Sequence, residues 1–132
     1  HIENPKILMK NLYKSLNENG KIIVNVPAFQ HLYSRFDKDV GHYKRYTKKS
    51  FLNELSLIKP TNVKMRYYDS LGYFLSLVSQ FFFSISEKYN NNYKNDFKNK
   101  IKIWNYLIPF SKILDKCVFY SVGKSLFIVI SK

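Results

Sequence analysis

The stretch NGKIIVNVP, residues 19–27, decides the fold that the sequence predicts. Its Asn-Gly pair favours the left-handed backbone that ends a helix. The β-branched run 21–26 that follows is typical of a mostly buried strand of the parallel type, and Pro27 ends it. A helix, a glycine turn and a buried strand in this order predict an α/β fold.

The segment before this stretch predicts the helix. Asn4 is a favourable N-cap, and Pro5 suits the first helical position because proline lacks the N–H that is unpaired there. Apolar residues recur at helical spacing along one face: Ile7, Leu8, Leu12 and Leu16. We therefore expect a helix over residues 5–18.

Two further strands and a helix are predicted downstream. Thr47 is the expected N-cap of a helix running to about Ile58. Its inward residues would be Phe51, Leu52, Leu55 and Ile58. Residues 62–69 alternate apolar and polar side chains, which predicts a strand with one wet face, and the continuous apolar run 126–131 predicts a central strand.

More than fifty residues separate those two strands, and they predict a helical insertion at about 71–122. Residues 71–86 carry no charge and are expected to be helical. Residues 90–92 are three asparagines in a polar stretch expected to be flexible, and the helical pattern resumes over 101–120, around Trp104 and Pro109.

Length and composition limit the classes of protein. A chain of 132 residues forms about one domain, and an apolar fraction of 45% excludes a disordered tail. A single cysteine, Cys117, argues against internal disulfides and zinc. We find neither a spanning segment nor a signal peptide, so a cytoplasmic location is the default expectation.

The chain is strongly basic, with a net charge of +13 from 22 basic and 9 acidic residues. Arginines number only three: Arg35, Arg45 and Arg66. Because arginine is favoured for bidentate contacts to phosphates and bases, a surplus of lysine indicates a general attraction to anions and no sequence-specific nucleic-acid binding. A solvated lysine surface that keeps the protein soluble is the alternative.

Three segments in order carry a resemblance. They are HIENPKILMKNLYKSLNENGKIIVNVPAF at 1–29, GHYKRYTKKSF at 41–51 and SLFIVISK at 125–132. Together they resemble the S-adenosylmethionine-dependent methyltransferases of the Rossmann-like class, in a bacterial subgroup with a GHYRRYT segment. Lys44 stands where that segment has an arginine, and Asn4 stands where an acid is common.

The resemblance implies a seven-stranded sheet flanked by helices, of which this chain supplies the last three strands. The sequence begins at His1 rather than Met, so we expect residues 1–132 to be the C-terminal fragment of a single methyltransferase domain. The family's glycine-rich loop is missing, since the glycines are isolated: Gly20, Gly41, Gly72 and Gly123. The fragment alone is therefore expected to bind S-adenosylmethionine poorly and to be inactive.

The segment 41–46 is the expected centre of the chemistry. Methyl transfer needs a group that accepts the acceptor's proton, and the neutral imidazole of His42 is the candidate base. Its neighbours are the candidate acceptor-binding residues: Tyr43, Arg45 and Tyr46. The structural alternative pairs Arg45 with Asp37 or Asp39 and gives the tyrosines the task of covering the sheet edge.

The long irregular segment 28–47 follows the strand that ends at Pro27, where α/β sheets place their ligands. It supplies four more candidate acceptor-binding residues: Phe29, His31, Tyr33 and Arg35. By the resemblance, His1 lies beside the cofactor, although a role in capping the first helix is an equal alternative. Neither a nucleophilic triad nor a metal site is predicted.

The partner expected by resemblance is a small-molecule, sugar or lipid-linked acceptor. The uncharged segment 71–86 forms either a helical lid on the sheet or, with the lysine-rich residues up to 102, a peripheral membrane contact. The competing function is a non-enzymatic basic module that binds a membrane surface or another anion.

Overall fold

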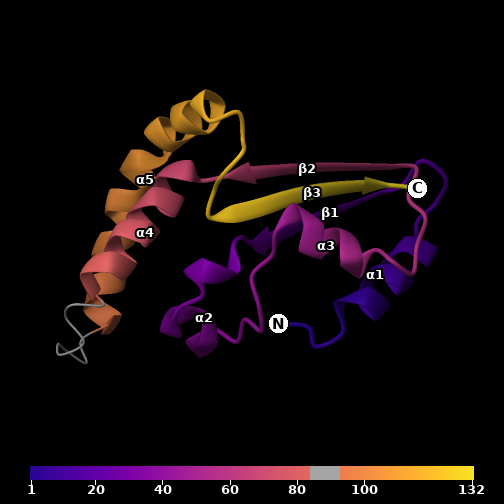
Figure 1. Cartoon of the computed structure of the whole chain (residues 1–132), viewed down its shortest axis with the longest axis horizontal. Coiled ribbons are helices and arrows are strands. Elements are labelled where there is room, and N and C mark those ends of the chain that lie inside the picture. The colour runs from indigo at the N-terminus through magenta and orange to yellow at the C-terminus, as the bar shows by residue number, and fades with distance from the viewer. Residues whose placement is uncertain (84–92) are drawn as a thin grey trace.

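The structure of the protein is a computed structural model. It describes residues 1–83 and 93–132, and the side chains of residues 1–80 and 105–132. Its sheet has three strands: β1 (Lys21–Pro27), β2 (Asn62–Tyr68) and β3 (Ser125–Ser131). Helices lie on one side of this sheet, and a pair of helices extends from one end of it (Figure 1). The fold is therefore mixed α/β, as the sequence predicts.

The strand order is β1-β3-β2, and both outer strands run antiparallel to β3. The prediction that the last apolar run is central is confirmed, because Leu126, Ile128 and Ile130 of β3 are fully buried. The prediction of a mostly buried, parallel-type strand is wrong for β1, which pairs antiparallel with β3 and whose Ile23 is 66% exposed. Apolar content predicted the strand itself but carried no information on its partner.

The first helix, α1 (Pro5–Lys14), begins as predicted: the Asn4 side chain accepts a hydrogen bond from the N–H of Ile7 at 3.5 Å. It ends four residues before the predicted position 18. The Ser15 hydroxyl donates to the carbonyl of Asn11, which competes with continued helix. Asn19 has the predicted left-handed backbone, at φ 60°, but it lies in a later turn. The C-cap of α1 is Ser15, so the prediction that the Asn-Gly pair ends this helix is wrong.

The helix after the long loop, α3 (Lys48–Glu54), begins at the predicted cap. Thr47 Oγ1 accepts from the N–H of Ser50 at 3.1 Å. Phe51 and Leu55 are buried as predicted, but Leu52 is half exposed and does not face inward. The helix ends at Glu54 and does not reach the predicted residue 58; residues 55–57 form turns instead.

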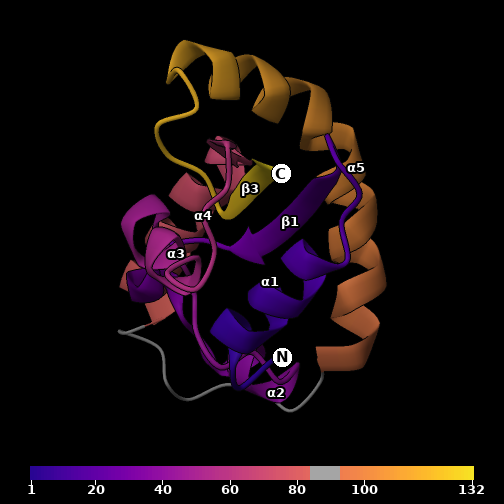
Figure 2. The ribbon, with the colours of Figure 1, turned by 90° about the vertical axis from the view of Figure 1, so that its right-hand side faces the viewer.

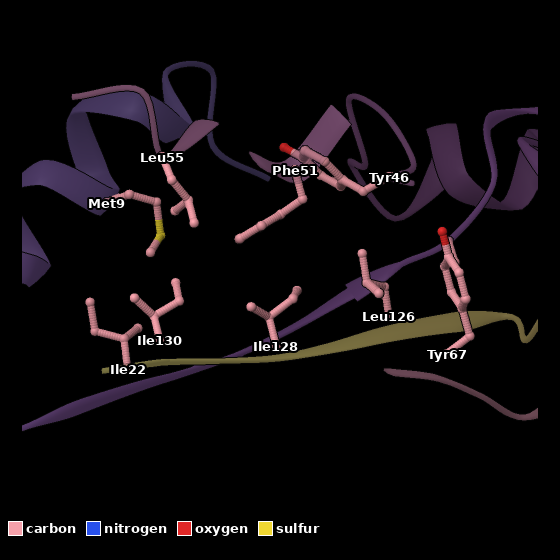
Figure 3. Close-up of a cluster of buried hydrophobic side chains, with 10 residues drawn as sticks. Met9, Ile22, Tyr46, Phe51, Leu55, Tyr67, Leu126, Ile128 and Ile130 are labelled. Atoms are coloured by element: carbon pink, nitrogen blue, oxygen red, sulfur yellow. The ribbon is translucent and has the colours of Figure 1, made fainter. Parts of the chain in front are cut away.

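The core lies between one face of the sheet and the helices α1 and α3 (Figure 3). The sheet contributes Ile22, Tyr67, Leu126, Ile128 and Ile130, and the segments facing it contribute Met9, Tyr46, Phe51 and Leu55. The alternation predicted for β2 is confirmed, because Tyr67 is buried whereas Lys64 and Arg66 are exposed.

Two helices, α4 (Ser70–Phe83) and α5 (Tyr93–Cys117), connect β2 to β3 and contact each other at one end of the sheet (Figure 1). In Figure 2, α5 runs along the right-hand side of the view and α4 lies to its left. Helix α5 begins earlier than the predicted residue 101, and the prediction for residues 90–92 lies outside the described residues. Among the helices that the structure describes, none is both long enough and apolar enough to span a bilayer.

The helical pair is joined to the sheet by a buried carboxylate. Asp115 of α5 accepts hydrogen bonds from the N–H of Ser70 at 2.7 Å and the N–H of Asp69 at 3.1 Å, at the start of α4. The Ser70 hydroxyl also donates to Asp115. These bonds satisfy N–H groups that have no partner within α4 and therefore fix where α4 leaves β2.

Candidate functional site

The segment between β1 and α3 leaves the sheet and returns to the same place. Ala28 and Tyr46 form an isolated parallel bridge, in which the N–H of Phe29 donates to the carbonyl of Tyr46 at 2.9 Å. The irregular loop predicted there contains a 3-10 turn, η1 (Gln30–Leu32), and a short helix, α2 (Arg35–Asp39). The bridge holds both ends of this segment against the sheet.

A buried carboxylate organises the segment. Asp37 is fully buried, and its Oδ2 accepts from the N–H of Ser34 at 2.9 Å and from the Ser34 hydroxyl. Arg45 donates to both oxygens, from Nε to Oδ1 at 3.0 Å and from Nη2 to Oδ2 at 2.9 Å. The structural alternative for Arg45, pairing with Asp37, is therefore what the structure shows, whereas Asp39 lies 4.0 Å from the exposed Arg35.

The same carboxylate holds His42, whose Nδ1 lies 2.9 Å from Asp37 Oδ1. Burial acts to raise the pKa of Asp37, but hydrogen bonds from Arg45, His42 and Ser34 outweigh it, so this pKa is below its ordinary value of 3.8. Asp37 is thus an ionised acceptor at neutral pH. Neutral His42 must then carry its proton on Nδ1, which leaves the Nε2 lone pair free to accept a proton.

The backbone around His42 is fixed as well. Its N–H donates to the carbonyl of Asp37 at 2.8 Å, and its carbonyl accepts from the hydroxyl of Tyr33 at 2.7 Å. The imidazole side chain is 23% exposed, and its Nε2 makes no hydrogen bond to the residues that the structure describes. The ring is therefore held from behind and accessible in front.

His42 lines a cavity of about 520 Å³. The cavity lies between α1, the carboxyl half of β1 and the residues around α2. Apolar walls come from Leu8, Met9, Val24, Val26 and Phe36, and the polar lining includes His1, Asp37, His42, Tyr43 and Arg45. The His1 ring packs edge-on against that of His42, with centroids 4.7 Å apart. This is an apolar pocket with convergent polar groups, the usual form of a small-molecule site.

Five of the predicted site residues meet at this cavity: His1, His42, Tyr43, Arg45 and Tyr46. They differ in how free their side chains are to bind an acceptor. Tyr43 is exposed at the cavity wall, whereas Tyr46 is buried against Phe51 with ring centroids 5.6 Å apart. The guanidinium of Arg45 is taken up by Asp37 and by the carbonyl of Ala28.

The other four predicted residues lie elsewhere. Phe29 stacks on Tyr67 with ring centroids 4.6 Å apart, and His31 Nε2 lies 3.3 Å from the hydroxyl of Tyr73 in α4. Tyr33 supports His42 through its backbone, and Arg35 is exposed on α2. Of these four residues, only Phe29 and His31 lie at the contact with α4, and none of the four lines the cavity.

Among the described residues, the cavity presents no unoccupied carboxylate. A cofactor such as S-adenosylmethionine needs closely approaching backbone N–H groups and a carboxylate for its ribose hydroxyls. The buried carboxylate at the cavity, Asp37, is already occupied by Arg45, His42 and Ser34. Within the described part of the chain, no group of three or more metal-binding side chains gathers either.

Asp37 is the functional residue that the sequence pattern revealed least clearly. The sequence offers it only as an alternative partner of Arg45 and does not predict its contact with His42. A usable signal was present: Ser34 and Asp37 have the spacing of a capping box, and both of its bonds form at the start of α2.

Comparison of the chain with models of protein families, with curated proteins and with solved structures gives no match.

Proposed function

We propose that the chain forms the acceptor side of an S-adenosylmethionine-dependent methyltransferase in which His42 is the general base. The observation that carries this proposal is the 2.9 Å contact between Asp37 Oδ1 and His42 Nδ1 in the wall of an accessible cavity. It fixes the imidazole tautomer that a base requires. The motif resemblance supplies the reaction class.

The base acts on the acceptor. When an acceptor hydroxyl lies in the cavity, His42 Nε2 takes its proton, and the ionised Asp37 stabilises the imidazolium that forms. S-adenosylmethionine supplies the methyl group as an electrophile on a sulfonium. Residues of a longer protein, outside this 132-residue sequence, would hold S-adenosylmethionine. We therefore expect the 132 residues alone to be inactive.

One edge and one face of the sheet are consistent with the proposal that it belongs to a larger Rossmann-like sheet. Within the described residues, β1 pairs with β3 along one edge, and its other edge carries no strand. Ile23 of β1 and Phe127 of β3 are exposed, and they alternate along their strands with the core residues Ile22, Leu126 and Ile128, so they lie on the face turned away from α1 and α3. Further parallel strands would extend β1, and their helices would cover this apolar face.

The acceptor that fits this cavity is a small molecule, a sugar or the head of a lipid-linked compound. Tyr43, which is exposed at the cavity wall, is suited to pack on a sugar ring. The competing function, a non-enzymatic basic module, accounts for the charge but gives the Asp37–His42 contact and its cavity no role. The methyltransferase proposal gives a role to the Asp37–His42 contact and to the cavity.

Calorimetry with S-adenosylmethionine tests the proposal. The 132-residue chain should give no heat, and a chain extended by the residues encoded upstream should bind. A folded extended chain that gives no heat, or an upstream frame that encodes no glycine-rich loop, would overturn the proposal.

Histidine variants of the extended chain test the base. His42→Gln should lower methyl transfer by about a hundredfold or more, because general-base catalysis contributes on that scale. His31→Gln is the matched control, since His31 lies outside the cavity. Equal losses in the two variants would contradict the role of His42.

A further inference from the structure

The C-terminal half of α5 carries an apolar stripe that faces solvent. Tyr106 is 79% exposed, Phe110 61% and Ile113 62%. Their spacing of four and three residues places them one above another on one face of the helix, and the exposed Cys117 continues that line. The opposite face is the one that packs inward, because Ser111 and Asp115 are buried.

Positive charge accompanies the stripe. Lys112 and Lys116 are exposed on the same two turns of α5. The only acidic residue in the sequence from 105 to 132 is Asp115, and its carboxylate is buried against the N–H groups of Asp69 and Ser70. The exposed charges of these turns are therefore all positive.

The cap that follows α5, which ends at Cys117, adds a second, independent observation. The N–H of Tyr120 donates to the carbonyl of Asp115, and the N–H of Phe119 donates to that of Lys116, which together form a Schellman cap. Phe119 sits at the left-handed position of this cap, with φ 50°, where glycine is strongly preferred. Its side chain is nevertheless 87% exposed, so internal packing does not compensate for the strained backbone.

We propose that these residues form a face that binds the surface of an anionic lipid bilayer. The α5 face comprises Tyr106, Phe110, Ile113 and Phe119, with Lys112 and Lys116 beside them. The aromatic and aliphatic side chains enter the boundary between headgroups and acyl chains, and the lysines contact anionic headgroups. Helix α5 lies along the interface and does not cross it.

Charge favours lipid over a second copy of the chain as the occupant. Each copy has a net charge of +13, and pairing two α5 faces would bring four lysines together. Such pairing is opposed by repulsion, whereas an anionic bilayer neutralises the same lysines. The proposal does not depend on the methyltransferase proposal, because it uses neither the cavity nor His42.

The single cysteine permits a direct test. An environment-sensitive fluorophore on Cys117 should shift its emission to the blue when vesicles of phosphatidylcholine with one-third phosphatidylglycerol are added. The shift should weaken with added NaCl and be much smaller with phosphatidylcholine alone. The control is the same label on Leu52→Cys in a Cys117→Ser background, because Leu52 is half exposed on α3. That label should not shift.

Vesicle sedimentation of variants completes the test. Phe110→Ser combined with Phe119→Gly should weaken binding by about a hundredfold, which is tenfold or more for each aromatic side chain withdrawn from the bilayer. Ile23→Ser, at an exposed position on the sheet, should bind as the unmodified chain does. Circular dichroism establishes that each variant is folded.

Three results would overturn the proposal. One is a lack of binding to anionic vesicles. Another is equal binding by the double aromatic variant, which would assign the attraction to net charge alone. The third is a dimer, seen by analytical ultracentrifugation without lipid and abolished by the same double variant, which would make the α5 face a contact between copies.

Discussion

Asp37 Oδ1 lies 2.9 Å from His42 Nδ1 while the same carboxylate accepts two hydrogen bonds from Arg45. A single buried acid therefore serves a permanent cation and a titratable ring. Because Arg45 keeps the carboxylate ionised, its contact with the imidazole does not depend on whether His42 is protonated. This arrangement holds the ring in one orientation through a full cycle of proton uptake and release.

Replacing Asp37 by asparagine tests this network through stability. Asp37→Asn leaves Arg45 as a buried charge without its partner, so the free energy of unfolding at pH 7 should fall by about 3–5 kcal/mol. Urea denaturation followed by circular dichroism measures this. Asp39→Asn is the control, because its carboxylate is largely exposed and its loss should change stability by less than about 0.5 kcal/mol.

The pH dependence of the same variant has a definite sign. Since the pKa of Asp37 is lowered in the folded protein, its stabilisation is complete above the ordinary value of 3.8 and is lost as the pH falls toward the folded value. The difference in the free energy of unfolding between the unmodified chain and Asp37→Asn should therefore become smaller below about pH 4. A difference that stays constant from pH 7 to pH 3 would count against the network.

The contribution of Asp69 to stability should depend on pH in the opposite direction. Burial raises its pKa above 3.8, despite hydrogen bonds from the N–H of Gly72 and the hydroxyl of Ser111. Its ionised form therefore destabilises the fold at neutral pH, and stability is gained as the pH falls through the folded pKa. Asn suits the left-handed backbone of Asp69, at φ 65°.

Asp69→Asn should accordingly raise the urea midpoint at pH 7. The amide oxygen retains the acceptor that Gly72 and Ser111 use, and the charge is removed. The advantage over the unmodified chain should shrink as the pH falls through the folded pKa of Asp69, which lies above 3.8, because the carboxyl then becomes neutral. A variant less stable than the unmodified chain at pH 7 would show that the ionised form is needed.

Phe119→Gly should stabilise the protein while impairing its membrane contact. The left-handed backbone costs a non-glycine residue about 1–2 kcal/mol, and glycine's greater freedom when unfolded offsets part of the gain. We expect a net increase of about 0.5–1 kcal/mol in the free energy of unfolding. Thermal denaturation measures it, and a decrease would mean that the exposed ring contributes to the fold.

The two faces of the sheet should respond unequally to truncation. Ile128→Ala in the central strand removes a fully buried side chain and should cost about 2–5 kcal/mol. Ile23→Ala, on the exposed face, should cost less than about 0.5 kcal/mol. If a longer protein covers that face, the same Ile23 substitution in the longer chain should become markedly more costly.

Local patterns predicted the elements, and long-range contacts decided what they pair with. The alternation in β2 and the apolar run of β3 are visible along the chain, and both strands form where they were expected. The direction of pairing of β1 depends on β3, about a hundred residues later, and no pattern within β1 encodes it. Leu52 likewise fits a helical stripe but lies beyond the edge of the covered face.

The site was predictable in its residues more than in its geometry. His42 and Arg45 lie at one cavity, as their shared segment suggested. Phe29 does not, because its left-handed backbone, at φ 61°, directs the chain toward Tyr67 and α4. A backbone reversal at a single aromatic residue has no clear signal in the sequence.

The central position of β3 has a consequence for synthesis. Among the described strands, β1 and β2 are joined only through β3, which leaves the ribosome after both of them. A nascent chain therefore carries two strands with unpaired edges until residues 125–131 emerge, and during that time it is open to aggregation or to capture by chaperones. The described helices can form early, but β1 and β2 pair with β3 only in a late step.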